Sequence, residues 1–210
     1  MVLKTFDVAN IPRVRAVPLT PESFAPYGGV ISADHQIKHV KSSGANYGTA
    51  VKIHKVAPIT NNYPASAPAT ANWNIYRCKA PKHLITHSGA KSTYKSTVLE
   101  RHPYTTQTFV PMGENLNKVA YLVIVAATDA NDPQKLPEPS QIKAFICKGN
   151  QAVTYGVGTW HAPMVVIDED IDHLDFAVMM HENGVADDDC QECYFEPGYE
   201  IEYTVNASKL

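Results

Sequence analysis

The sequence predicts an all-β protein, a closed or sandwiched antiparallel barrel of the jelly-roll kind with few short helices. Two observations support this prediction. The 15 prolines and 11 glycines recur throughout the 210 residues and divide the chain into short segments. Most of these segments are rich in β-branched and aromatic residues, which is typical of strands. A barrel of this kind encloses a central cavity, and such a cavity is a natural site for a small molecule.

Twelve segments are expected to form strands. In chain order they are 13–18, 29–32, 50–56, 73–78, 93–102, 107–111, 120–127, 152–155, 160–167, 174–181, 192–195 and 200–205. A helix is expected at 21–27, because Thr20 can cap its first turn and Pro21 suits its first position. A second helix of two turns is expected at 140–148. Loop insertions are expected at 61–71 and 129–139 from their composition.

The composition indicates one soluble domain spanning 1–210. The apolar fraction is 44% and the charged fraction is 19%, both ordinary for a globular protein. A net charge of −3 gives no electrostatic reason to expect nucleic acid or an anionic membrane as a partner. No apolar run approaches the ~20 residues of a membrane span, and the first residues lack the apolar stretch of a secretory signal.

The cysteines and the tail bear on the cellular compartment. Cys78, Cys147, Cys190 and Cys193 fit a reducing compartment. Only the last two have the spacing of metal ligands, and a structural zinc site would need a second pair. The chain ends in Ser-Lys-Leu at 208–210, the tripeptide that the peroxisomal import receptor binds. We therefore expect a peroxisomal protein, with the cytoplasm as the alternative.

Four polar side chains could converge on one reaction site. Glu100 and His102 lie two residues apart, so on an extended strand both point to the same face. Gln107 could join that face from the next segment, and His161 could join it from a segment about fifty residues later. A carboxylate, two imidazoles and an amide that all point inward suit acid–base chemistry.

Several sequence motifs along the chain have counterparts in a known protein family. They are Leu-Glu-Arg-His-Pro at 99–103, Thr-Gln-x-Phe-x-Pro-Met at 106–112, Phe-x-x-Tyr-Gly-x-Val-Ile at 24–31 and Trp-His-x-Pro at 160–163. Together they closely resemble the ureidoglycolate lyase family of the cupin superfamily. The first two motifs are long and unusual, and so they are the most specific. The resemblance extends over about residues 18 to 205.

The resemblance implies a cupin double-stranded β-helix that commonly forms a homodimer. It also implies a carbon–nitrogen lyase of the amidine-lyase class, which cleaves (S)-ureidoglycolate to glyoxylate and urea in allantoin and purine breakdown. Two other functions stay open at this point. One is a metal-dependent cupin oxygenase or isomerase, and the other is a non-catalytic cupin that binds a small ligand.

The sequence departs from the usual metal-cupin pattern of two His and a Glu followed by a later His. Glu100, His102, Gln107 and His161 fill those places. Because the amide of glutamine is a weak metal ligand, the sequence predicts no firm cofactor. A divalent metal held by the carboxylate and the two imidazoles is the alternative.

Cleavage of a ureido acid requires a base, an acid and a cation for the substrate carboxylate. We expect His102 and His161 to transfer the protons, in either order, because the pKa of histidine lies near neutral pH. Glu100 could orient an imidazole or act as the base. Gln107 can both donate and accept, which suits the ureido group. The candidates for binding the carboxylate sit elsewhere in the chain and are Arg77 and Lys52.

Overall fold

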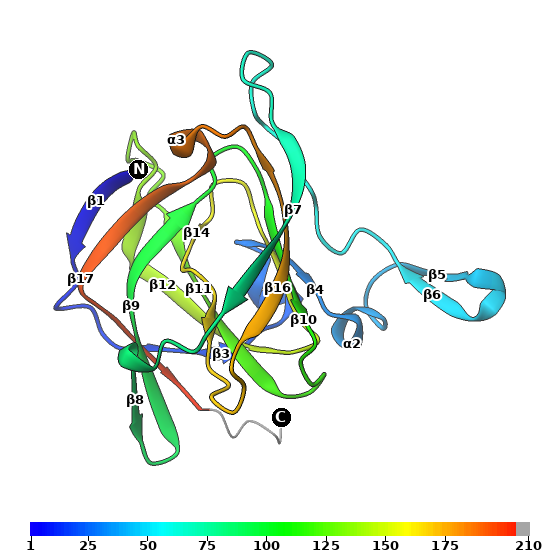
Figure 1. Cartoon of the computed structure of the whole chain (residues 1–210), viewed down its shortest axis with the longest axis horizontal. Coiled ribbons are helices and arrows are strands. Elements are labelled where there is room, and N and C mark those ends of the chain that lie inside the picture. The colour runs from blue at the N-terminus through cyan, green and yellow to red at the C-terminus, as the bar shows by residue number, and fades with distance from the viewer. Residues whose placement is uncertain (205–210) are drawn as a thin grey trace.

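Two mostly antiparallel β-sheets face each other in the computed structural model, which describes residues 1–204 (Figure 1). The larger sheet has ten strands and the smaller sheet has five. A buried cluster that includes Phe24, Phe109, Tyr121 and Phe176 fills the space between them. The prediction of an all-β jelly-roll barrel with few short helices is therefore confirmed. The tripeptide at 208–210 lies outside the described residues.

The elements have the following bounds. The larger sheet contains β1 (Val2–Asp7), β2 (Val14–Arg15), β3 (Val17–Pro18), β8 (Ile85–Ser88), β9 (Lys91–Arg101), β11 (Val119–Thr128), β12 (Pro137–Lys148), β14 (Trp160–His161), β15 (Val165–Val166) and β17 (Gln191–Tyr203). The smaller sheet has the order β4 (Gly28–Ile31), β13 (Ala152–Tyr155), β10 (Gln107–Met112), β16 (Leu174–Glu182) and β7 (Thr70–Cys78). A separate hairpin consists of β5 (Ser42–Ala45) and β6 (Ala50–Ile53). The helical turns are α1 (Pro21–Phe24), α2 (Ala33–Gln36), α3 (Ala186–Asp189) and the 3₁₀ turns Asn46–Gly48 and Lys82–Leu84.

The first predicted helix is present but shorter than expected. Thr20 accepts a hydrogen bond from the backbone N–H of Ser23, and the Ser23 hydroxyl accepts one from the Thr20 N–H. This capping box and Pro21 begin the helix, as the sequence indicates. The helix ends at Phe24, whose buried ring packs edge-on against Phe145.

The second predicted helix, at 140–148, is wrong. These residues belong to β12, which pairs with β11 from Tyr121 opposite Cys147 to Ala126 opposite Ile142. The segment is compatible with two helical turns when considered alone. Pairing with β11 satisfies its backbone groups and buries Phe145, and this tertiary contact overrides the local preference.

Besides β12, three strands were not predicted, namely β1, β5 and β8. The predicted segment at 192–195 and the part of the segment at 200–205 up to Tyr203 belong to one strand, β17, with an irregularity in its pairing between Tyr194 and Tyr199. Gly198 lies in this irregularity with φ of 106°, a conformation that glycine adopts without steric cost.

Strand β11 is buried on both faces. Tyr121, Val123 and Val125 belong to the cluster between the two sheets. Leu122 and Ile124 point the other way, into a second core that the larger sheet forms by curling over itself. The prediction that this apolar run is a buried strand is therefore confirmed.

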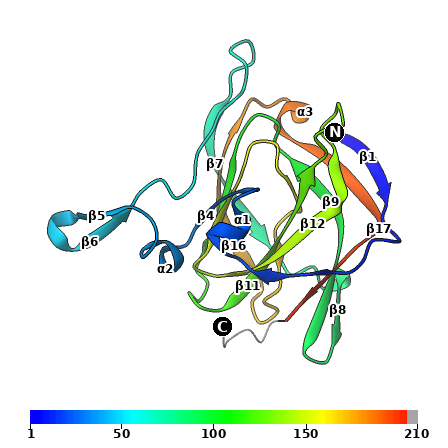
Figure 2. The same cartoon turned by 180° about the vertical axis from the view of Figure 1, so that it is seen from behind.

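The β5–β6 hairpin stands apart from the barrel. In Figures 1 and 2 it extends away from one side of the molecule, beyond the short helix α2. Its backbone pairing runs only between its own two strands, from Ser42 opposite Ile53 to Ala45 opposite Ala50. No helix within residues 1–204 is long and apolar enough to cross a membrane.

Candidate active site

The sheet register places Glu100 directly opposite His161. Strand β14 pairs with β9 through these two residues. Their neighbours Leu99 and Trp160 are fully buried in the second core. Because successive side chains on a strand alternate in direction, Glu100 and His161 must point to the opposite side, between the two sheets. Glu100 Oε1 lies 3.5 Å from His161 Nε2, and the side chains are 21% and 1% exposed.

His102 lies beside this pair with one nitrogen free. Its ring centroid is 5.4 Å from that of His161. Its Nδ1 lies 2.6 Å from the backbone oxygen of Asp189, and since a carbonyl only accepts, Nδ1 carries the hydrogen. Among residues 1–204 the buried Nε2 has no hydrogen-bond partner. Burial and the charge of His161 lower the pKa of His102, so its ring is neutral and Nε2 presents a lone pair.

His161 meets an oxygen at each ring nitrogen. Its Nδ1 lies 2.9 Å from the carbonyl oxygen of Thr159, and its Nε2 lies 3.2 Å from Gln107 Oε1. Glu100 Oε1 is the third nearby acceptor. Oxygen acceptors at both nitrogens suit a doubly protonated imidazolium, which donates at each. His161 is therefore placed to give a proton, whereas His102 is placed to take one.

The ionised form of Glu100 is favoured at this position. Burial alone would raise the pKa of Glu100, but the hydrogen bond and charge of His161 outweigh it, so the pKa is lowered. A carboxylate beside an imidazolium forms an ion pair that holds both groups in place.

Gln107 is buried beside His161, and its amide can make further hydrogen bonds. In the described part of the chain its amide nitrogen donates only to the sulfur of Met180, at 3.4 Å, and a thioether is a weak acceptor. A ligand carbonyl would be a better acceptor for this amide. Glu100, His102, Gln107 and His161, the four side chains that the sequence brings together, are thus adjacent in the structure.

Cys190 is a residue of this site that the sequence did not reveal. Its sulfur lies 3.9 Å from Glu100 Oε2 and donates to it. Burial and the charge of Glu100 raise the pKa of Cys190 to about 12, so it stays a thiol. No local sequence pattern indicates this contact, because Cys190 reaches Glu100 only through the pairing of β17 with β9. Cys193 is buried in the second core, whereas Cys190 lies beside Glu100, so the two thiols belong to different surroundings.

The two predicted cations do not join the site within one chain. Arg77 forms two 2.9 Å hydrogen bonds to the carboxylate of Asp175, and its side chain is 63% exposed. Its neighbour Tyr76 stacks on Phe109 between the sheets, so Arg77 faces outward. Lys52 lies on β6, in the hairpin that stands away from the barrel (Figure 1).

The carboxylate and the two imidazoles could hold a divalent metal. Single ligand atoms of Glu100, His102 and His161 lie within 4.8 Å of one another. The orphaned Nε2 of His102 is the strongest sign that these residues fit an ion, because a buried nitrogen without a partner is costly. Imidazole and carboxylate ligands suit zinc, iron or manganese.

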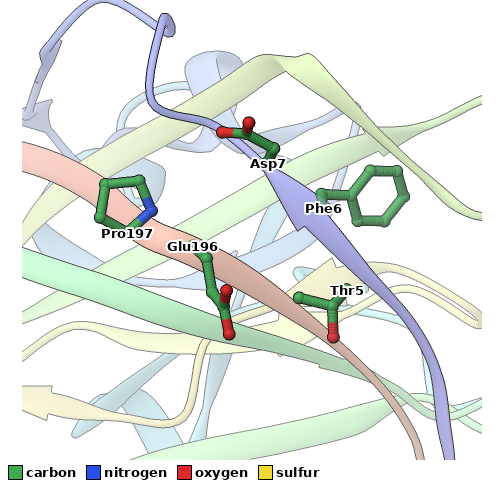
Figure 3. Close-up of a pocket in the computed structure, with 5 residues that line it drawn as sticks. All are labelled: Thr5, Phe6, Asp7, Glu196 and Pro197. Carbon is green, nitrogen blue, oxygen red and sulfur yellow. The ribbon is translucent and has the colours of Figure 1, made fainter.

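A hollow at the surface lies elsewhere. It has a volume of about 610 Å³, and Thr5, Phe6, Asp7, Glu196 and Pro197 line it between β1 and β17 (Figure 3). None of these residues touches the imidazole pair, and two carboxylates without a base or a nucleophile beside them offer little chemistry. The polar group around His161 therefore remains the candidate active site.

The fold and these side chains define a cupin-type barrel with an acid–base site between its sheets. The family model for ureidoglycolate lyase matches residues 11–202, and the chain belongs to that family. Ureidoglycolate lyase of Saccharomyces cerevisiae is 43% identical over 194 residues, which cover 88% of this chain and 95% of the relative. Ureidoglycolate lyase of Schizosaccharomyces pombe is 41% identical over 85% of this chain and 90% of the relative. Ureidoglycolate lyase of Brucella anthropi is 29% identical over 90% of this chain and 95% of the relative.

Proposed function

We propose that this chain is a ureidoglycolate lyase that cleaves (S)-ureidoglycolate to glyoxylate and urea, a step of allantoin and purine breakdown. The observation that carries the proposal is the pair of unlike imidazoles. His102 offers a buried lone pair at Nε2, and His161 faces oxygen acceptors at both nitrogens. A base and an acid 5.4 Å apart, measured between ring centroids, suit a substrate whose hydroxyl and leaving nitrogen share one carbon.

The reaction follows from these roles. His102 Nε2 takes the proton of the substrate hydroxyl, and the oxygen forms the carbonyl double bond of glyoxylate. The carbon–nitrogen bond breaks, and its electron pair stays on the urea nitrogen. His161 gives that nitrogen its Nε2 proton, while Glu100 stabilises the imidazolium beforehand. The proton that His102 has gained returns to His161 through solvent, which restores the site.

Gln107 supports recognition of the ureido group. Its amide nitrogen has only a sulfur acceptor in the protein, so the urea carbonyl would replace a weak partner with a strong one. Its position beside His161 Nε2 would hold the leaving nitrogen near the proton that it must receive.

A divalent metal at the same side chains is the alternative to this mechanism, because an imidazole nitrogen bound to a metal can neither take nor give a proton. Glu100, His102 and His161 would hold it, and such an ion would polarise the oxygen of the substrate as a Lewis acid. Metal analysis of the purified protein, before and after dialysis against a chelator, tests this part. Metal loss without loss of activity would leave the two imidazoles as the sole acid–base machinery.

Urea release from racemic ureidoglycolate, followed with a coupled assay, tests the proposed function. We expect equal amounts of urea and glyoxylate from the wild-type protein, and consumption of one enantiomer only. His102→Asn, which keeps a polar side chain but removes the base, is the matched control and should be nearly inactive. Folded wild-type protein that released no urea above the uncatalysed rate would refute the proposal.

A homodimer and peroxisomal import also belong to this proposal. Trp73 and Ile75 expose large apolar side chains on the outer face of β7, which supports contact with another chain. The Ser-Lys-Leu tripeptide supports import, because the receptor recognises it at a free carboxyl end. Light scattering tests the first point. Localisation of a fluorescent fusion with and without the tripeptide tests the second.

A further inference from the structure

Within residues 1–204, the candidate site has no lysine or arginine of its own to bind an anionic substrate. Arg101 follows Glu100 but points away, and its guanidinium donates to Gln191 and to the backbone oxygens of Gln134 and Lys135. Arg77 is held on the outer face by its ion pair with Asp175. A substrate carboxylate needs a cation, and within residues 1–204 of one chain no lysine or arginine is seen to contact Glu100, His102 or His161.

The surroundings of the site are acidic instead. We use the term acidic cluster for Glu182, Asp188, Asp189 and Glu192. Glu192 lies with Cys190 and Glu100 in a group whose ligand atoms are within 4.8 Å. Glu182 accepts hydrogen bonds from the side chains of Asn72 and Asn74, which lie on the same face of β7 as Tyr76. An approaching anion would be repelled unless positive charge covered this cluster.

Positive and negative charges are segregated along the sequence. Between Asp34 and Glu100 there is no Asp or Glu, and there are nine basic residues: Lys38, Lys41, Lys52, Lys55, Arg77, Lys79, Lys82, Lys91 and Lys95. Between Lys148 and Lys209 there is no Lys or Arg, and the acidic cluster belongs to this part. The chain therefore carries a basic region and an acidic region that could bind one another in two copies.

The basic β5–β6 hairpin lacks a partner in its own chain. Lys38, Lys41, Lys52 and Lys55 form no ion pair among the described residues. Tyr47 at the tip and Val51 on β6 are exposed. An isolated two-stranded hairpin is marginally stable in water, so this one needs a surface to pack on.

A second copy of this chain offers that surface. Its acidic cluster complements the charge of the hairpin. The outer face of β7 adds Trp73, 68% exposed, and Ile75, 71% exposed. In Figures 1 and 2, β7 and the hairpin lie on the same side of the barrel, so one two-fold axis could bring both into a single interface.

We propose that the hairpin of one copy reaches the Glu100–His161 site of its partner and supplies Lys52 there to bind the substrate carboxylate. Lys52 is the best placed lysine because pairing with Ser43 fixes its backbone within the hairpin. Lys41 and Lys55 lie at the base of the hairpin, outside its paired strands. The inference rests on the proposed function for the nature of the ligand. The contact between the copies does not depend on it.

Complementation between two defective variants tests the exchange. Lys52→Ala keeps the catalytic side chains but removes the cation, so KM should rise about 10- to 100-fold. His102→Asn keeps the hairpin but removes the base. If the two are unfolded and refolded together in equal amounts, half of the dimers are mixed and have one complete site. At substrate concentrations far below KM, activity should then recover to about a quarter of the wild-type value.

Matched controls make this result specific. Lys95→Ala removes an exposed lysine of β9 from the same basic region and should leave KM unchanged. Each variant refolded alone should stay defective. A mixture no more active than the average of its two components would overturn the proposal, because sites completed within one chain cannot complement.

Cross-linking tests the contact without any activity. In a Cys78→Ala background, Lys52→Cys should join Cys190 of a second copy through a short bismaleimide and yield a covalent dimer; the reaction is run at alkaline pH and for long times, because the Cys190 thiol ionises only at high pH. The link should disappear when Cys190→Ala is added, and Lys95→Cys should form none. A monomer in light scattering, or a dimer without this link, would overturn the proposal. A link in a protein that releases no urea would support the contact and refute only the lyase function.

Discussion

The phenol ring of Tyr155 lies flat against the imidazole of His161, with ring centroids 3.8 Å apart and an angle of 13° between the planes. An aromatic face stabilises a cation above it by ~0.5–2 kcal/mol. Tyr155→Leu should therefore lower kcat several-fold, because the protonated form of His161 loses this support. Rates across a pH series measure the effect.

The hydroxyl of Tyr155 is not part of this interaction. It reaches only the sulfur of Met164, at 3.9 Å. Tyr155→Phe keeps the ring and should retain nearly the wild-type kcat. A large loss in this variant would show that the hydroxyl, rather than the ring, has a role in the reaction.

Activity should decline on the acidic side as His102 becomes protonated. The pKa of His102 is lowered below its ordinary value of 6.5, so the ring is neutral at pH 7 and kcat/KM should fall only below that value. His102→Asn should reduce kcat by about 100- to 10,000-fold. The pH profile of the residual activity should lose its acidic limb.

The same group links pH to stability. Because the folded state holds the proton of His102 less tightly than the unfolded chain, the free energy of unfolding should fall as pH falls from about 6.5. The loss ends once pH is below the lowered pKa of the folded state. Urea denaturation at several pH values, compared between wild type and His102→Asn, measures this contribution.

Gln107→Glu should shift the site towards metal binding. The new carboxylate would lie beside His161 Nε2, where the glutamine oxygen now lies at 3.2 Å, and would add a strong ligand to Glu100 and His102. We expect more bound divalent metal per chain in elemental analysis, together with a higher KM for the ureido acid. Gln107→Met, which adds no ligand oxygen, should raise KM without the gain in metal.

Arg77→Ala should leave catalysis within about twofold of wild type and change stability little, because exposed ion pairs contribute little. Its guanidinium is engaged with Asp175 on the outer face. Asp175→Ala is the matched control and should behave alike. A large rise in KM confined to Arg77→Ala would restore the role that the sequence predicts for it.

Cys190 should react slowly with iodoacetamide at neutral pH, since its pKa is raised to about 12. Glu100→Gln removes one of the charges that raise this pKa and should accelerate the alkylation. Mass spectrometry of the Cys190 peptide measures both rates. Equal rates in the two proteins would show that the charge of Glu100 does not affect the reactivity of the Cys190 thiol.

The sequence predicts those parts of the site that depend on short spacing. Glu100 and His102 are two residues apart, near the end of β9 and just beyond it, and the extended backbone that the sequence predicts there gives them a common direction. The contact between Glu100 and Cys190 depends on the register of β9 and β17, which no local pattern encodes. The same limit explains the misassigned segment at 140–148, whose structure is decided by its partner β11.

The placement of Arg77 illustrates a different limit. A strand pattern shows which residues alternate, but it does not show which of the two sets faces the interior. Here Tyr76 points inward to Phe109, so its neighbour points outward. Trp73 and Ile75 point outward together with Arg77. Because large apolar side chains usually point into a core, nothing in the sequence indicates that this face of the strand is the outer one.

The burial of β11 on both faces ties the chemistry to the folding of the whole molecule. Val125 pairs with His161, while its neighbour Ile124 belongs to the second core. Neither core can open without exposing the other side of this strand. The backbone amides of β11 should therefore exchange with deuterium only through global unfolding, and heat should abolish activity and both cores in one transition.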